Sequence, residues 1–331
     1  MYSVIKGVGH AVPFRVLSNA DLEQMVETED QWIVQRTGIR ERRIADEEMA
    51  TSDIALEAAR AALADAGVAP EDLDLIIVAT VTPDHAFPAT ACLVQRELMA
   101  WGAAAFDLEA ACTGFIYGLS IADQFIRTGT YGTVLVIAAD ILSKITDYTD
   151  RNTCILFGDG AGAAVLQAGD EPGLLSMEIG ADGHGGHLLV QPAGGSRNPA
   201  RAETVAARQH FIQMAGREVF KFAVKVMEES SLRVLEQTGL STEDVSLLVP
   251  HQANSRIIES ACKRLGIDRE KVYVNLDRYG NMSAASIPVA LSEASAQGLL
   301  KSGDHVLLVG FGGGLTWGAA VIKWTKEGQY D

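Results

Sequence analysis

The sequence predicts an α/β protein made of two similar halves. Apolar, β-branched stretches of strand length alternate with alanine-rich stretches of helical periodicity along the 331 residues, which is typical of βαβ units. One such unit also recurs, because Leu63–Val78 resembles Leu235–Pro250 over its whole length. We therefore expect helix-covered βαβ halves over residues 1–172 and 173–331, with the chemical residues of both halves meeting near a pseudo-twofold axis.

Each element of the N-terminal half follows from a local signal. Acidic residues suit the first turn of a helix capped by Ser18 or Asn19, Gly67 ends an alanine-rich helix, and β-branched runs indicate buried strands. In chain order, the expected elements are strand Tyr2–Gly7, the capped helix, helix Thr51–Ala66, strand Asp72–Thr80, helix Ala89–Leu98, a strand before Cys112, a helix from Phe115 to Gly129, strand Thr133–Ala139 and strand Ala163–Gln167.

The C-terminal half opens with a glycine-rich stretch that lacks periodicity. We expect a loop-rich insertion there, near residues 182–210. His184 and His187 lie on this stretch without a carboxylate or thiolate cluster, so solvated histidines are favoured and no metal site is expected. Further on, Leu248–Pro250 reads as the end of a buried strand, and a helical pattern follows it.

Composition and charge exclude several classes of function. The net charge of −16 argues against general nucleic-acid binding, which requires a basic face. The four cysteines stand far apart without a Cys-x-x-Cys pair, which argues against a zinc knuckle or a disulfide framework. The apolar runs are much shorter than a bilayer span, and the first residues lack the pattern of a signal peptide, so we expect a cytoplasmic protein.

The stretch Asp107–Phe115 organises the predicted chemistry. A strand-like segment ends in small residues, reaches Cys112 and passes at once into a helical pattern. The free N–H groups and the positive end of a helix favour the thiolate, which is the nucleophilic form of cysteine. A single free cysteine is more often a small buried apolar residue. The nucleophile hypothesis therefore depends on His251 and Asn281.

Two polar residues of the C-terminal half lie at corners of the same kind. His251 follows a buried strand, and open α/β sheets bind ligands beyond the carboxyl ends of their strands. Asn281 precedes a helix rich in small residues, and the internal similarity aligns it within a few residues of Cys112. Taken singly, His251 would be a buried histidine whose ring is hydrogen-bonded within the core, and Asn281 would be an asparagine that caps a helix. Together with the cysteine they form a candidate catalytic site.

These segments resemble the β-ketoacyl-acyl-carrier-protein synthase III family of thiolase-like condensing enzymes. The resemblance depends on Glu109–Cys112, Pro250–Asn254 and Gly280–Ser286. Further similar segments, in the family's order along nearly the whole chain, are Trp32–Ile39, Phe157–Ala163 and Gly312–Gly318. One position departs from the family's pattern, because Met282 stands where a small polar residue is usual.

The resemblance implies a five-layer αβαβα fold and a reaction, the decarboxylative Claisen condensation that initiates fatty-acid synthesis. Cys112 would attack an acyl-coenzyme A primer, and the backbone N–H groups of Cys112 and Gly313 would stabilise the oxyanion. His251 and Asn281 would each donate a hydrogen bond to the thioester oxygen of malonyl-acyl-carrier protein as CO2 leaves. Coenzyme A is then part of a substrate, no cofactor is expected, and the chain length and branching of the primer stay open.

The resemblance also assigns binding residues and a homodimer. Trp32, Arg36 and Arg151 would contact the adenine and phosphates of coenzyme A. The alternatives are that Trp32 is a buried side chain of the core and that Arg36 is an ordinary solvated charge. The remaining assignments are Gly216, Phe220 and Asn254 along the pantetheine tunnel, Phe87 in the acyl pocket of the partner subunit, and Lys221, Arg256 and Lys263 on the acidic acyl carrier protein. Ordinary solubilising charge is the alternative for the last three.

Other functions share some of these features. A ketosynthase or acyltransferase of polyketide or secondary metabolism would keep Cys112 but use another acceptor. A non-catalytic carrier-binding partner would typically lack the nucleophile, and a redox sensor would need a resolving cysteine close in sequence. A papain-like protease would place its cysteine near the mature N-terminus in another sequence context. The glycines of Gly158–Gly162 lack the G-x-G-x-x-G spacing and the Lys-Ser/Thr pair of nucleotide-binding loops.

Overall fold

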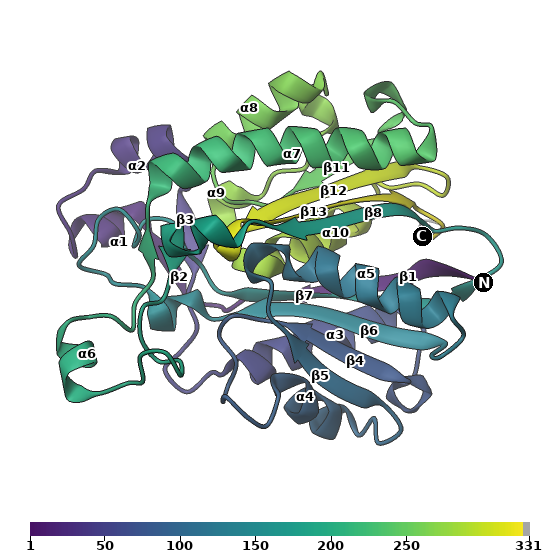
Figure 1. Cartoon of the computed structure of the whole chain (residues 1–331), viewed down its shortest axis with the longest axis horizontal. Helices are drawn as coiled ribbons and strands as arrows, with labels where there is room; N and C mark the ends of the chain where they lie inside the picture. Colours follow the sequence, from purple (N-terminus) through teal and green to yellow (C-terminus); the bar gives the residue numbers. More distant parts are fainter. Residues whose placement is uncertain (327–331) are drawn as a thin grey trace.

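Two large β-sheets and three layers of helices alternate through the molecule, and two short two-stranded sheets lie outside these layers. The structure, a computed structural model, describes residues 1–326. The layers follow the order αβαβα, and the two sheets face each other across a central layer of helices (Figure 1). This arrangement confirms the expected α/β class and its five layers.

The lower sheet in Figure 1 is built from the N-terminal part of the chain. Its strand order is β1-β7-β6-β4-β5, in which the three strands β4, β5 and β6 are parallel and the other two are antiparallel to their neighbours. The strands are β1 (Tyr2–Ala11), β4 (Leu75–Ala79), β5 (Ala104–Leu108), β6 (Thr133–Asp140) and β7 (Gly160–Gly169). Every residue of β4 and β6 is buried, as expected for apolar strands that are covered by helices on both faces.

The upper sheet is built from the C-terminal part of the chain. Its strand order is β11-β12-β13-β8, with a parallel first pair and antiparallel pairs after it. The strands are β8 (Leu174–Ala181), β11 (Leu247–Pro250), β12 (His305–Gly312) and β13 (Thr316–Lys323). The expected strand that ends at Pro250 is therefore confirmed. The chain passes from one sheet to the other between β7 and β8, and the division into halves after residue 172 stays a prediction.

Two helices, α5 (Gly114–Arg127) and α10 (Ser286–Ala296), form the central layer. Residues Ser286 to Ala294 are all buried, which explains why this segment is rich in small side chains. Strand β7 also approaches α10 closely, because a Cβ on Gly162 of β7 would lie 2.7 Å from the backbone nitrogen of Val289. Glycine at that position therefore lets helix and strand pack directly on one another.

Four helices cover the outer faces of the two sheets. The lower sheet packs against α3 (Thr51–Ala66) and α4 (Thr90–Leu98), and the upper sheet against α7 (Gly216–Thr238) and α8 (Ser255–Leu265) (Figure 1). The bounds of α3 agree with the prediction. Gly67 follows it with φ +63°, a left-handed conformation that ends the helix and that glycine adopts at little cost.

Short elements complete the described chain. They are β2 (Val16–Ser18), α1 (Asn19–Glu23), α2 (Asp30–Thr37), β3 (Glu41–Arg43), β9 (Leu189–Val190), α6 (Ala202–Ala206), β10 (Gln213–Met214) and α9 (Leu276–Tyr279). Ser18 caps α1, as expected, because its side chain accepts a hydrogen bond from the Asp21 N–H. No helix within residues 1–326 combines the length and the apolar character that crossing a bilayer requires.

The carboxyl ends of four strands lead into one region between the sheets. Thr80 follows β4 and donates a hydrogen bond to Asp140, the last residue of β6. His251 follows β11, and its N–H donates to Val309 of the neighbouring β12. A Cβ on Gly312, the last residue of β12, would lie 2.7 Å from the Cys112 nitrogen. The fold therefore gathers the predicted chemical residues at the carboxyl edge of both sheets.

Candidate active site

Cys112 lies on a tight turn between β5 and α5. The turn, Ala111–Thr113, forms a short 3-10 helix, and Ala111 adopts a left-handed conformation with φ +45°. The hydroxyl of Thr113 donates to the Ala110 carbonyl at 2.6 Å, and the hydroxyl of Thr316 donates to the same carbonyl at 3.2 Å. Contacts within the turn and from β13 of the upper sheet therefore fix the strained backbone that presents the thiol.

Burial opposes the activation of the Cys112 thiol that we expect from the helix end. Cys112 is buried, and burial raises the pKa of its thiol to about 12. The regular helix α5 begins only at Gly114, after the 3-10 turn. Loss of hydration by the thiolate therefore outweighs the favourable field of the helix end.

The end of β12 passes between Cys112 and His251. A Cβ on Gly310 would lie 3.5 Å from the Cβ of His251 and 3.8 Å from the carbonyl oxygen of Cys112. A Cβ on Gly313 would lie 3.5 Å from the Cβ of Ala111, so this residue also borders the turn of the nucleophile. These are ordinary van der Waals distances, and only Gly312, where a Cβ would lie 2.7 Å from the Cys112 nitrogen, approaches the turn too closely for a side chain.

His251 is held as a neutral ring with a defined orientation. The side chain is buried, and burial lowers its pKa to about 3. Nδ1 lies 2.6 Å from the hydroxyl oxygen of Ser286, which also accepts the Gln252 N–H at 3.3 Å. A serine hydroxyl can accept two hydrogen bonds and donate one, so this contact orients the ring in either neutral tautomer. In the tautomer in which Ser286 donates to Nδ1, the ring proton is on Nε2, and Nε2 is a hydrogen-bond donor.

Asn281 is fixed through its backbone and its carbonyl group. Its N–H donates to Leu156 at 2.8 Å, and its backbone oxygen accepts from Gly158 at 3.0 Å. Its side-chain Oδ1 accepts the N–H of Ser283 at 2.8 Å. The acceptor end of the side chain is thus occupied, and the Nδ2 amide is the end that can donate to a ligand.

One short segment, residues 281–286, touches both other members of the trio. Ser283 lies next to the Cys112 thiol and lowers its pKa, although burial dominates. Ser286, on the same segment, holds the ring of His251. The structure therefore brings Cys112, His251 and Asn281 together from loops that are far apart in the sequence.

The side chain of Met282 does not point into the site, so it neither enlarges nor blocks it. Its side chain is buried in a small apolar cluster with Tyr279, Ala285 and Val289. Its sulfur also fills the space beside Gly160, where a Cβ would lie 2.5 Å from it. The departure from the family's pattern is thus an element of core packing.

The three residues predicted to bind coenzyme A lie together, with Trp32 and Arg36 on α2 and Arg151 against the Trp32 ring. The Arg151 guanidinium lies 4.0 Å from the ring centroid of Trp32, and that of Arg36 lies 5.3 Å from it. Trp32 also packs against a buried apolar cluster that includes Ile33 and Cys154, so part of its role is structural. An aromatic face with two guanidinium groups suits a purine and its phosphates.

Asn254 has a structural role that the sequence assignment did not include. Its Oδ1 accepts the Arg256 N–H at 2.9 Å and caps α8, and its Nδ2 donates to the Arg36 carbonyl at 3.1 Å. This side chain therefore ties α2 to α8. Gly216 begins α7, and Phe220 lies one turn later, where the Arg256 guanidinium lies 5.9 Å from its ring.

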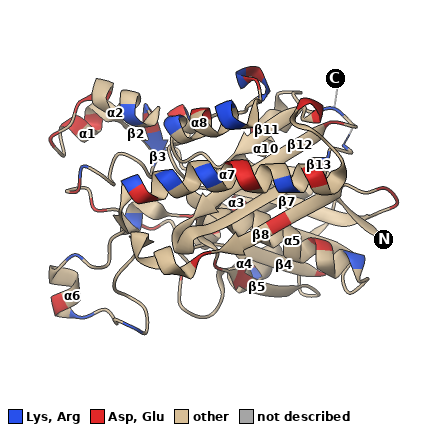
Figure 2. Cartoon of the chain, turned by 45° about the horizontal axis from the view of Figure 1, so that its top comes forward, with Lys and Arg blue, Asp and Glu red and all other residues tan. Residues whose placement is uncertain are grey.

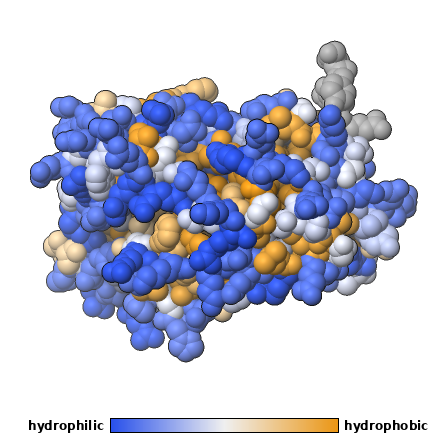
Figure 3. Space-filling model, turned by 90° about the horizontal axis from the view of Figure 1, so that it is seen from above, coloured by the Kyte–Doolittle hydropathy of each residue, from blue (hydrophilic) through white to orange (hydrophobic). Residues whose placement is uncertain are grey.

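The basic residues assigned to the carrier protein lie on neighbouring helices. Lys221 is exposed on α7, and Arg256 and Lys263 are exposed on α8. Basic and acidic residues are interspersed along α7 (Figure 2), and two further basic residues, Arg264 and Lys225, pair with glutamates of α7. Seen from above, this face is largely hydrophilic, with hydrophobic side chains visible between the polar ones (Figure 3). The patch is thus a modest local cluster on an acidic protein.

Phe87 is exposed to solvent in the single chain. Its side chain is 85% exposed, and Met99 and Trp101 near the amino end of β5 are also well exposed. Strand β5 is the edge of its sheet, with a partner on one side only. Large apolar side chains beside an open strand edge are typical of a surface that another chain covers.

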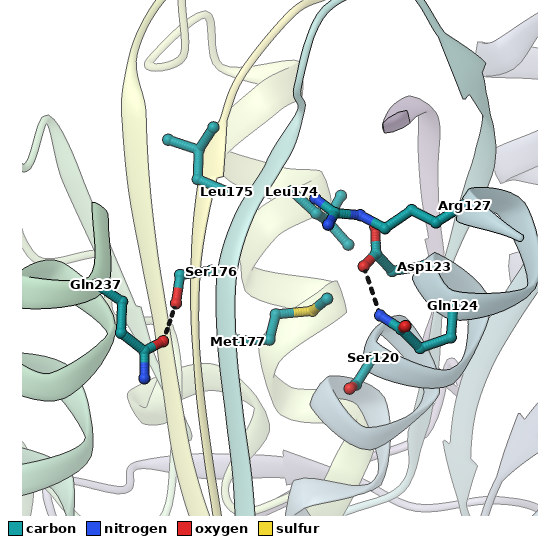
Figure 4. A pocket seen from close by; sticks show the side chains of 9 residues that line it. All are labelled: Ser120, Asp123, Gln124, Arg127, Leu174, Leu175, Ser176, Met177 and Gln237. Atoms are coloured by element: carbon teal, nitrogen blue, oxygen red, sulfur yellow. Dashed lines mark hydrogen bonds and ion pairs between the residues drawn. The ribbon is translucent and has the colours of Figure 1, made fainter. Parts of the chain in front are cut away.

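A surface pocket of about 290 Å³ lies elsewhere, between α5, β8 and α7 (Figure 4). Its lining side chains are Ser120, Asp123, Gln124, Arg127, Leu174, Leu175, Ser176, Met177 and Gln237. The polar groups pair with one another, since Asp123 accepts from Gln124 at 3.0 Å and from Arg127 at 3.1 Å. This pocket contains none of the predicted catalytic residues.

Two residues that shape the site were not singled out from the sequence. Ser286 fixes the imidazole, and Ser283 lies beside the thiol. Both lie in a segment that the motifs already contain, but serines in a small-residue helix give no signal of such contacts. His184, in the glycine-rich stretch, is fully exposed and pairs with Asp182 at 2.8 Å. Within residues 1–326, no cluster of three His, Cys, Asp or Glu side chains could hold a metal ion.

Comparison with known proteins gives consistent results. Residues 106–183 match the family model for 3-oxoacyl-[acyl-carrier-protein] synthase III, and residues 235–324 match the model for its C-terminal part. The chain is 62% identical over 325 residues to a β-ketoacyl-[acyl-carrier-protein] synthase III of Desulfitobacterium hafniense, covering 98% of each chain.

Solved structures agree with this similarity. A 3-oxoacyl-[acyl-carrier-protein] synthase III of Aquifex aeolicus is 49% identical with a TM-score of 0.90, covering 97% of this chain and 100% of that one. The priming β-ketosynthase of the R1128 polyketide pathway is 35% identical with a TM-score of 0.92, covering 98% of this chain and 97% of that one.

Proposed function

The chain belongs to the 3-oxoacyl-[acyl-carrier-protein] synthase III family, and we propose how its own residues divide the work of that reaction. It is a condensing enzyme that initiates fatty-acid synthesis. The reaction joins an acyl-coenzyme A primer to malonyl-acyl-carrier protein with loss of CO2, through an acyl-cysteine intermediate. The observation that carries the assignment of roles is the contact of residues 281–286 with both Cys112 and His251.

The first half-reaction transfers the acyl group to Cys112. The sulfur attacks the thioester carbon, and coenzyme A leaves, which divides one difficult step into two easier ones. The oxyanion of the tetrahedral intermediate needs fixed donors, and the N–H groups of Cys112 and Gly313 are proposed to supply them. The close approach of the glycine segment to the nucleophile's turn supports this assignment.

The second half-reaction generates an enolate from the malonyl group. Decarboxylation itself creates the nucleophile, so no carboxylate base is required, and the negative charge develops on the thioester oxygen. Nε2–H of His251 and the Nδ2 amide of Asn281 are proposed to donate to that oxygen. One such donor contributes about 3 kcal/mol, or on the order of a hundredfold in rate. The neutral ring and the occupied acceptor groups support these roles.

The binding residues complete the proposal. Trp32, Arg36 and Arg151 hold the nucleotide end of coenzyme A, as their stacked arrangement supports. The pantetheine arm passes Gly216, Phe220 and Asn254, and the acyl carrier protein meets Lys221, Arg256 and Lys263. Charge complementarity supports the last assignment, because an acidic partner is attracted to exposed basic groups on α7 and α8.

A homodimer is part of the proposal. The exposed Phe87 and the open edge of β5 support a second copy of the chain on that side, with Phe87 entering the acyl pocket of the partner. The cytoplasmic location stays a prediction.

A priming role in polyketide synthesis is the second candidate function. The similarity to the priming β-ketosynthase of the R1128 pathway favours it, at lower identity than the relatives from fatty-acid synthesis. Primer and carrier preference separates the two functions, because they share the chemistry of Cys112.

Intact mass after mixing with a panel of acyl-coenzyme A thioesters tests the function. We expect the wild type to gain the mass of one acyl group and Cys112→Ala to gain none. The thioester that reacts fastest identifies the primer. Acylation that persists in Cys112→Ala would contradict the proposed nucleophile.

A further inference from the structure

A buried carboxylate of the central layer binds the segment that leads to Asn281. Glu293, on α10, accepts five hydrogen bonds from residues 273–279. The donors are the Tyr273 hydroxyl at 3.2 Å, the Asn275 amide at 2.8 Å, the Arg278 guanidinium at 3.0 and 2.9 Å and the Tyr279 hydroxyl at 2.7 Å. Burial alone would raise the pKa of Glu293, but these hydrogen bonds, that of Arg278 foremost, bring the pKa below its usual value. The carboxylate is therefore ionised and paired.

The bonded segment connects the two side chains that we assign to the enolate oxygen. It begins beside β11, where the Tyr273 N–H donates to the Leu248 carbonyl at 2.9 Å, and β11 ends directly before His251. It then passes through α9 and one glycine to Asn281. The position of Asn281 relative to His251 therefore depends on how this segment is held.

Gln252 ties the same segment to the loop of His251. Its side chain is fully buried, and its Oε1 accepts the Asn275 N–H at 3.2 Å. Its Nε2 donates to the Tyr273 carbonyl at 3.2 Å and to the Pro250 carbonyl at 2.8 Å. Asn275 therefore contacts the central carboxylate through its side chain and the histidine loop through its backbone.

One face of α10 reaches both enolate donors. Ser286 and Glu293 stand at i and i+7, about two helical turns apart, so they share a face of the helix. Ser286 contacts Nδ1 of His251 at 2.6 Å, and Glu293 contacts the segment before Asn281. All residues of α10 from 286 to 294 are buried, so the helix is fixed by close packing along this length. It provides a single rigid reference for both donors.

Stability alone does not require a charged group at this position. Well-packed apolar side chains often replace a buried ion pair without loss of stability. Directed hydrogen bonds do something that apolar contacts do not, because they weaken steeply when distance or angle changes. Tyr279 donates to one carboxylate oxygen and Asn275 to the other, so both ends of α9 are held. The carboxylate therefore fixes the position of this segment more narrowly than packing would.

We propose that Glu293 is a positioning residue for decarboxylation, which holds residues 273–279 so that Asn281 Nδ2 and His251 Nε2 reach the same thioester oxygen. The inference rests on the proposed function, in which these two groups stabilise the enolate. Donors of this kind must lie about 2.7–3.1 Å from the oxyanion, and a misplacement of about 1 Å costs on the order of a hundredfold in rate. Acylation of Cys112 uses other donors, so it does not depend on Glu293.

Two variants and a matched control test the inference. Glu293→Gln keeps the shape of the side chain but removes its charge and one acceptor oxygen. Tyr279→Phe keeps the ring and removes a single hydrogen bond, so it decides the question where the first variant folds poorly. Glu178→Gln is the control, because Glu178 of the edge strand β8 also accepts a two-pronged bond from an arginine, Arg233, at 2.6 and 2.7 Å, and a further bond from Trp317 at 3.0 Å.

The measurements separate the two half-reactions and the two kinetic constants. Acylation is the coenzyme A released in the first turnover without the malonyl substrate. CO2 release is then timed on the acyl-enzyme over a range of malonyl-acyl-carrier protein concentrations, which gives kcat and KM separately. Thermal midpoints are recorded for every variant. Glu293→Gln is also combined with Asn281→Ala in a double-mutant cycle.

We expect Glu293→Gln to lower kcat for CO2 release about 10- to 100-fold, with little change in KM for malonyl-acyl-carrier protein or in acylation. Tyr279→Phe should cause a smaller fall in the same constant. Glu178→Gln should resemble the wild type in both half-reactions. In the Asn281→Ala background, Glu293→Gln should lower CO2 release much less, because the donor that it positions is already absent.

Three results would overturn the inference. The first is CO2 release at the wild-type rate by whichever of the two variants fold. The second is an equal fall in acylation and CO2 release, since it indicates a general structural role. The third is a fall of undiminished size in the Asn281→Ala background, because Glu293 would then not act through that donor. A wild type that is never acylated, or an Asn281→Ala variant that releases CO2 at the wild-type rate, would instead contradict the proposed function.

Discussion

Replacing Ser286 by alanine tests what fixes the tautomer of His251. The Ser286 hydroxyl lies 2.6 Å from Nδ1, and both residues are buried. Without this hydroxyl a buried ring nitrogen loses its partner, at a cost of about 1–3 kcal/mol. The ring can then also adopt the tautomer in which Nε2 accepts rather than donates. This cost corresponds to a fall of about 5- to 150-fold in the rate of decarboxylative condensation.

The assay separates the two half-reactions. Acyl-enzyme formation is measured by intact mass, and the preformed acyl-enzyme is then mixed with malonyl-acyl-carrier protein. We expect Ser286→Ala to acylate normally and to condense slowly, because the hydroxyl acts on His251. Ser292→Ala is the matched control, since Ser292 lies on the same helix and bonds the Nδ1 of His10 at 2.9 Å.

Two outcomes would refute this reasoning. Condensation by Ser286→Ala at the wild-type rate would show that the bond does not set the donor. An equal fall in Ser292→Ala would show that any serine-to-alanine change in α10 disturbs the site.

Three further predictions follow from single contacts. Gly312→Ala places a Cβ 2.7 Å from the Cys112 nitrogen. We therefore expect the fold to be destabilised by about 1–3 kcal/mol in thermal unfolding and acylation to be lost. An unchanged thermal midpoint would contradict the close approach of Gly312 to the Cys112 turn. Arg151→Ala should raise KM for acyl-coenzyme A about 2- to 30-fold with little change in kcat, and unchanged KM would exclude the stacking role. Arg208→Met removes the partner that holds the pKa of Asp147 well below its usual range. Because the pKa of Asp147 is lower in the folded than in the unfolded chain, the pair stabilises the fold fully at pH values above the unfolded pKa of about 4. This stabilisation decreases as the pH falls below that value. The loss in unfolding free energy should therefore be small at pH 7, because the pair is exposed and screened by water, and it should fade in acid; urea titrations at neutral and at acidic pH would show both effects.

The elements of this fold were predictable where local chemistry sets them. Gly67 ends α3 because of its positive φ, and the apolar runs of β4 and β6 are buried strands because both faces are covered. The trio was predictable because each member stands at a strand or helix end, where side chains reach the edge of the sheets. The internal similarity then indicated that these edges meet.

The pKa values and side-chain contacts of the site residues could not be predicted from such local signals. The pKa of Cys112 depends on how completely both halves exclude water, and a short helical motif carries no measure of that exclusion. The contact of Ser286 with the His251 ring depends on two segments that are distant in sequence. Met282 looked like a change at the site, whereas its side chain belongs to a separate apolar cluster.

The division of labour among the catalytic side chains has one direct test. His251→Ala is loaded with the preferred acyl-coenzyme A, its acylation is verified by intact mass, and CO2 release from malonyl-acyl-carrier protein is then timed. We expect full acylation on Cys112 and a fall in CO2 release of about a hundredfold or more, because one enolate donor is lost. Condensation at the wild-type rate by this acylated variant would contradict the role assigned to His251.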